Sequence, residues 1–112
     1  MDEYQIMTGA SELVCKSFDL EPLPAGLPAT SGDVLRELRI MLTARIMELL
    51  ETNYEKLLSA LYLIDVSEEK SRAAFQQKTN ADVAVALADL IIERHMEKAK
   101  TRLERRQASQ EL

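Results

Sequence analysis

The residue types that most often carry chemistry are scarce in this 112-residue sequence, which has one histidine, His95, and one cysteine, Cys15. Glu93 and Glu97 flank His95, but on a helix they share a face while His95 points about 200° away from Glu93. A tetrahedral zinc site needs several histidine or cysteine ligands. We therefore expect no catalytic residue, no metal and no cofactor, although a Cys15–His95 pair brought together by folding stays open.

Arginine side chains offer a second kind of chemistry, the binding of an anion. Arg36, Arg39 and Arg45 fall within one predicted helix, and a second basic set begins at Arg94. In chain length and in this arginine-bearing first helix the sequence resembles the helical chorismate mutases, which implies a dicarboxylate ligand. The ordered Arg…Arg…Lys…Glu pattern of that family is missing. A small anion-binding helical enzyme or ligand-binding bundle therefore stays an alternative function.

The net charge of −5 is unevenly distributed along the chain. Residues 1–93 carry 8 basic and 16 acidic side chains, whereas residues 94–112 carry 6 and 3. An acidic surface repels nucleic acid. A helix-turn-helix around residues 64–67 would open its second helix with Glu68 and Glu69, two carboxylates facing phosphates. A DNA-binding regulator is therefore the disfavoured alternative, and we do not expect nucleic acid as a partner.

The elements that position these residues are expected to be helices. Good helix formers dominate from residue 33 onward, and two of the three glycines and all three prolines lie within residues 22–32. The acidic start of the chain is unlike a signal peptide, and no apolar run approaches the ~20 residues that cross a bilayer. We expect a cytoplasmic protein with no membrane partner.

Four capping signals predict four helices in an all-α fold. The prediction is a small long–short–short–long bundle over residues 33–106, preceded by an acidic N-terminal arm with a Pro/Gly linker over residues 1–32. The arm is expected to be extended or partly helical, and residues 107–112 to form a disordered tail. The predicted helices cover residues 33–51, 53–64, 67–77 and 80–106, and the signals start at Thr30, Thr52, Asp65 (with Ser67 as a rival cap) and Thr79.

The last predicted helix is longer than the helix it would pack against. At ~1.5 Å per residue, residues 33–51 extend roughly 28 Å and residues 80–106 roughly 40 Å, so the end of the last helix would overhang with an apolar seam. We therefore predict a non-enzymatic helical interaction or oligomerisation module, most simply a homodimer, with an acidic protein segment as a possible partner. The predicted partner-binding residues are Ile92, Met96, Ala99 and Leu103 on the seam and Arg94, Lys98 and Arg102 beside it.

Two stretches carry a resemblance to known sequences. LSALYLIDVSEEK (58–70) and LADLIIERHMEKAKTR (87–102) resemble a group of short, uncharacterised bacterial all-helical proteins with no assigned activity. The likeness covers roughly residues 34–103. It implies no activity, cofactor or site residue, but it implies that residues 33–106 are one unit and residues 1–32 an appendage.

Overall fold

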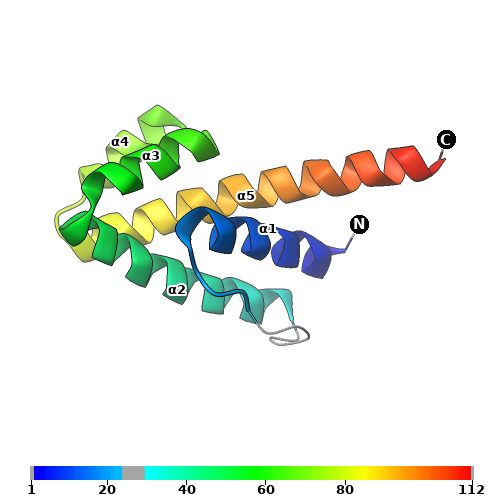
Figure 1. Ribbon diagram of the computed structural model, residues 1–112, viewed down its shortest axis with the longest axis horizontal. Helices are drawn as coiled ribbons and strands as arrows, with labels where there is room; N and C mark the ends of the chain where they lie inside the picture. The colour runs from blue at the N-terminus through cyan, green and yellow to red at the C-terminus, as the bar shows by residue number, and fades with distance from the viewer. Residues whose placement is uncertain (1, 24–29, 112) are drawn as a thin grey trace.

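The structure is a computed structural model that describes residues 2–23 and 30–111. Over these residues the chain forms five helices and no strand, which confirms the all-α class. Figure 1 shows α1 and α2 running opposite to α5, with the short helices α3 and α4 together near one end of it. The helices are α1 (Glu3–Phe18), α2 (Ser31–Thr52), α3 (Tyr54–Ile64), α4 (Glu68–Phe75) and α5 (Asn80–Glu111).

Side-chain caps decide where these helices begin, because they accept from backbone N–H groups that have no partner within the helix. Thr30 and Thr79 each accept from the N–H three residues ahead at 3.1 Å, as predicted. At the other two predicted starts a neighbouring residue is the cap. Asn53 rather than Thr52 accepts at 3.2 Å at the start of α3, and Ser67 accepts at 3.3 Å at the start of α4.

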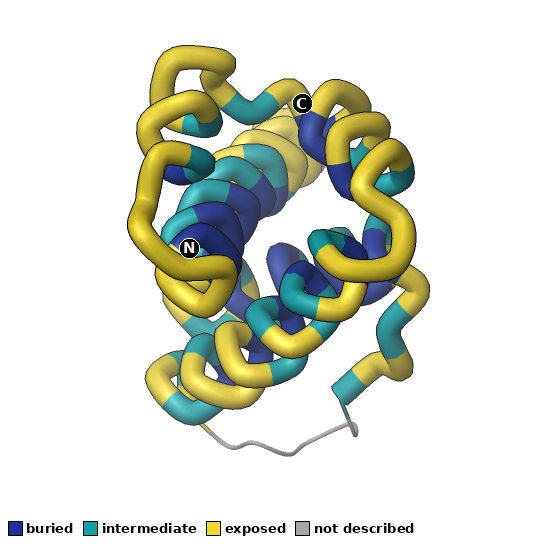
Figure 2. The backbone as a smooth tube through the Cα atoms, turned by 90° about the vertical axis from the view of Figure 1, so that its left-hand side faces the viewer, coloured by how far each residue is buried: buried dark blue, intermediate teal, exposed yellow. Residues whose placement is uncertain are grey.

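One hydrophobic core joins helices that are distant in sequence. Leu38, Leu42 and Ile46 of α2 are fully buried, as are Leu87 and Ile91 of α5. Figure 2 shows that buried residues lie where the helices face one another and exposed residues on the outer sides. The same core includes residues of all five helices; the others are Val14, Cys15, Phe18, Leu49, Leu57, Leu61, Ile64, Ala74, Val83, Ala84, Ala88 and Ile92.

The predicted N-terminal arm contains a full helix of the bundle. Met7, Ala10, Val14 and Phe18 of α1 are buried at helical spacing, and α1 and α5 form the most extensive contact between any two helices. In the described part of the chain the bundle therefore consists of five helices, whereas four helices and an N-terminal arm were predicted. The Pro/Gly linker was predicted over residues 20–32; residues 24–29 of it lie outside the described residues, and Ser31 and Gly32 belong to α2.

α5 is the longest helix, with 32 residues that extend about 48 Å. It continues to Glu111 through residues 107–111, for which a disordered tail was predicted. Its C-terminal end projects past the N-terminus of α1 in Figure 1. Within the described residues, none of the five helices combines the length and the apolar character that a membrane crossing requires.

Candidate functional site

The apolar seam that the sequence analysis assigned to a partner is covered by the chain's own α1. Ile92 and Ala99 are 3% and 4% exposed. Met96 packs against the shared core, and Leu103 is half-buried in a cavity of about 230 Å³ that α1 and α5 line together. The expectation of an uncovered strip is corrected by this packing, because the segment taken for an arm lies along the seam as a helix.

The basic residues beside the seam do not form one strip. Arg94 donates to Glu97 at 3.1 Å and also lies 3.6 Å from Asp65, in the turn before α4. Lys98 is half-buried, and burial, with Arg94 nearby, lowers its pKa. Arg102 is exposed and lines the cavity on the α1 side. The three side chains therefore face different surroundings.

His95 is a buried residue of the α1–α5 contact, 3% exposed. The Ser17 hydroxyl donates to the Leu13 carbonyl at 2.8 Å, so it accepts from His95 Nε2–H at 3.4 Å. This network assigns the proton to Nε2, and Nδ1 has no partner among the described residues. Burial, helped by Lys98 and Arg94, lowers the pKa of His95 to about 4. The imidazole is therefore neutral at neutral pH.

Cys15 is also buried, but the contacts of the structure do not join it to His95. Its Sγ donates to the Glu21 carbonyl oxygen at 3.6 Å. Burial raises the pKa of this thiol, which keeps it protonated and poorly nucleophilic. Over residues 2–23 and 30–111, no three His, Cys, Asp or Glu side chains gather as metal ligands would.

The arginines considered for anion binding are held by acids of the same chain. Arg36, Arg39 and Arg45 donate to carboxylates at 2.8, 2.8 and 2.6 Å, and Arg45 also donates to the Phe18 carbonyl at 3.1 Å. Arg36 and Arg39 line a groove beside α2, whereas Arg94 lines a different one. The two basic sets are therefore not gathered around one anion site, and the anion-binding alternative gains no support.

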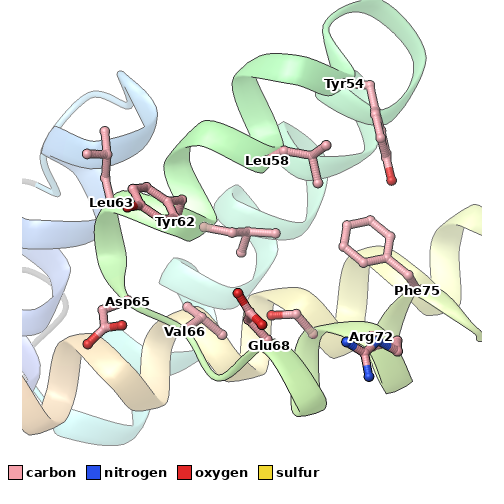
Figure 3. Close-up of a pocket in the computed structure, with 11 residues that line it drawn as sticks. Tyr54, Leu58, Tyr62, Leu63, Asp65, Val66, Glu68, Arg72 and Phe75 are labelled. Atoms are coloured by element: carbon pink, nitrogen blue, oxygen red, sulfur yellow. The ribbon is translucent and has the colours of Figure 1, made fainter.

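A different feature collects exposed apolar surface: a groove of about 730 Å³ between α3 and α4. Tyr54, Leu58 and Tyr62 of α3 line it at i, i+4, i+8 spacing, and they are 47%, 42% and 83% exposed. At one end Tyr54 meets Phe75 of α4 edge-to-face, with ring centroids 5.9 Å apart. Leu63, 78% exposed, lies at the other end (Figure 3).

The turn between α3 and α4 explains why the groove forms. α3 ends at Ile64 and is capped by Asp65, whose left-handed φ of 65° reverses the chain, and Ser67 then caps α4. The chain therefore brings α4 back beside α3, while Leu57, Leu61 and Ile64 of α3 are buried in the core and Ala60 packs against it. The rest of the apolar surface of α3 is left as one wall of the groove.

Charges mark the two ends of this groove. Asp65 lies toward one end and Arg72 toward the other, with Glu68 between them, as Figure 3 shows. The side chain of Asp65 is 86% exposed, so its carboxylate is accessible. Glu68 and Glu69 form the first turn of α4, where a DNA-reading helix would meet phosphates. This acidic turn gives the DNA-binding alternative no support.

The groove residues were missed because helical spacing within residues 53–64 predicts that Tyr54 and Leu58 face inward with Leu57 and Leu61, whereas Tyr54 and Leu58 are 47% and 42% exposed. A signal was present: residues 54–64 read YEKLLSALYLI, with apolar side chains around nearly the whole helix. A surface helix needs only one apolar stripe to pack on its own core. The additional apolar side chains of this helix therefore indicated a second face that another surface covers.

Comparison with protein-family models, with curated proteins and with solved structures finds no match to this chain. The resemblance of residues 34–103 to a bacterial group stays a prediction. Function is therefore inferred from the geometry of the described residues alone.

Proposed function

We propose that this protein is a non-enzymatic interaction module that binds an amphipathic helix of another protein in the groove between α3 and α4. The observation that carries the proposal is the distribution of exposed apolar side chains. Six large ones are more than 40% exposed in the described part of the chain, and four of them, Tyr54, Leu58, Tyr62 and Leu63, line this one groove.

The shape of the groove supports a helix as its occupant. An apolar groove between two helices accepts a third helix whose side chains at i, i+3, i+4 and i+7 enter it. Tyr and Phe are typical of the energetically dominant positions in such interfaces, and Tyr54 with Phe75 forms a rigid aromatic end wall. Each large side chain of the partner gains about 1.5–3 kcal/mol on full burial.

The charges support a basic partner and a preferred direction. Asp65 at one end, with Glu68 between it and Arg72, attracts a Lys- or Arg-bearing end of the incoming helix, while Arg72 toward the other end repels one. Glu69, beside Glu68 in the first turn of α4, adds to the negative potential at that end. Rim charges of this kind contribute mainly to the association rate and to orientation.

The test uses the full chain and a designed helical peptide of leucine and lysine, about 14 residues or four turns long. We expect binding that shifts the backbone NMR signals of α3 and α4. A peptide with the same leucine pattern and glutamate in place of lysine should bind at least tenfold more weakly.

The decisive variant is Leu58→Asp, with Ile40→Asp on α2 as the matched control. Leu58→Asp adds a negative charge, so purely electrostatic attraction predicts tighter binding of the basic peptide, whereas an apolar groove predicts a loss of more than tenfold. Any one of three results would overturn the proposal. These are an unchanged affinity of Leu58→Asp for the peptide, equal effects of the two substitutions on the affinity, and NMR signal shifts outside α3 and α4. A lower molar mass of Leu58→Asp than of wild type would show instead that a second copy occupies the groove.

A further inference from the structure

We propose that a second copy of this chain docks on a separate groove between α2 and α5 and forms a two-fold symmetric dimer. The groove has a volume of about 670 Å³ and shares no lining residue with the groove between α3 and α4. It contains the other two exposed large apolar side chains, Ile40 at 60% and Val85 at 46%. The small residues Thr43 and Ala44 also line it, so another helix pair can approach closely.

The occupant follows from the charges on the two helices, which are complementary to each other. The α2 residues that line the groove include Arg36 and Arg39 and no acid. On α5, Asp82 and Asp89 lie three residues before and four residues after Val85, on the same side of the helix. The face therefore carries arginines along α2, apolar side chains in the middle and carboxylates along α5, and within one chain Arg36 pairs with Asp33 and Arg39 with Asp89, each at 2.8 Å.

A face of this kind is complementary to the same face of a second copy. The ion pair between Arg39 Nε and Asp89 Oδ1, at 2.8 Å, shows that these residues lie level on antiparallel helices. A two-fold axis parallel to the helices would lay α2 of one copy on α5 of the other. Arg39 then lies over Asp89 of the second copy, Ile40 lies beside its Val85, and each contact occurs twice, as two-fold symmetry requires.

Mixing two charge-reversed variants of the full chain tests this arrangement by molar mass, measured by sedimentation or light scattering. Wild type is expected to reach twice the chain mass of 12.7 kDa as its concentration rises. Arg39→Glu makes the face acidic and Asp89→Arg makes it basic, so each variant alone is expected to be monomeric. An equimolar mixture of the two is expected to recover the dimer, because the acidic face of one variant then meets the basic face of the other.

A second pair of variants separates the apolar contact from the proposed peptide groove. Ile40→Asp should give a monomer that still binds the leucine–lysine peptide, whereas Tyr62→Asp should keep the dimer. Far-UV circular dichroism checks that each variant is folded, and all these side chains are more than 40% exposed. The dimer would be overturned by a wild type that stays monomeric up to millimolar concentration, by a dimeric Ile40→Asp, or by a mixture that stays monomeric. None of these results bears on the peptide-binding proposal, which has its own test.

Discussion

Gly9 of α1 lies directly against Ala99 of α5, so that a Cβ at position 9 would stand only 3.3 Å from the Ala99 Cβ. This is tighter than ordinary van der Waals contact between carbons. The approach lets α1 lie along the seam and bury Ala99 to 4% exposure. The pairing of a glycine with an alanine thus helps to make the N-terminal segment part of the bundle.

We expect Gly9→Leu to lower the free energy of unfolding by about 1–3 kcal/mol, because the larger side chain overpacks the contact with Ala99. Gly32 is the control, since nothing lies within 4 Å of where its Cβ would be. Gly32→Ala should gain about 0.5–1 kcal/mol from helix propensity, and Gly9→Ala should gain less. Urea denaturation measures all three. Equal gains for the two alanine variants would show that the contact has no energetic effect.

His95 is expected to make the protein less stable in mild acid. Its pKa is near 6.5 in an unfolded chain and about 4 in the folded protein, so the unfolded state binds the proton more readily. The stability that this difference contributes is fully present above pH ~6.5 and is lost as the pH falls toward 4, up to about 3 kcal/mol.

The measurement compares wild type with His95→Gln, which stays neutral and can still donate to Ser17. The free energy of unfolding of wild type minus that of His95→Gln should fall between pH 6.5 and 4, because only wild type loses the stability that the neutral imidazole contributes. The carboxylates titrate alike in both proteins, so their effect cancels in this difference. A difference that does not change with pH in this range would contradict the lowered pKa of His95.

Asp65→Gly is expected to stabilise the fold by up to about 1 kcal/mol. Asp65 adopts a left-handed conformation with φ of 65°, which glycine adopts without the steric cost of a Cβ. The ion pair lost with Arg94 is long, at 3.6 Å, and the Asp65 carboxylate is 86% exposed, so it contributes little. Asp65→Ala keeps the Cβ and is the matched control. The urea midpoint of Asp65→Gly should exceed that of Asp65→Ala, and the reverse order would be inconsistent with strain at this position.

The helices from α2 to α5, and the regions where they start, were predictable because their causes are local. Thr30 and Thr79 accept hydrogen bonds from the backbone N–H groups three residues ahead. These groups are close in any chain that starts a helix at such a residue, whatever the rest of the fold. Where two cap residues were adjacent, as at Thr52 and Asn53, the pattern identified the region but not the residue. The choice depends on which backbone geometry the packed helices allow.

The candidate sites were less predictable, because the type of an apolar side chain does not specify which surface will cover it. Sequence spacing predicted Tyr54 and Leu58 in the core and the Met96–Leu103 seam on the outside, whereas folding leaves Tyr54 and Leu58 exposed and Met96 and Leu103 half-buried. Hydrophobic burial is non-directional, so several packings satisfy one pattern.

The sequence by itself determined the helical class of the described residues and a set of helix starts, because these depend on residue types and near neighbours. Only the tertiary structure decided that α1 covers the seam and that α3 and the α2–α5 face keep their apolar side chains in water. That decision depends on close approaches such as Gly9 to Ala99, between residues 90 positions apart, which no local pattern encodes.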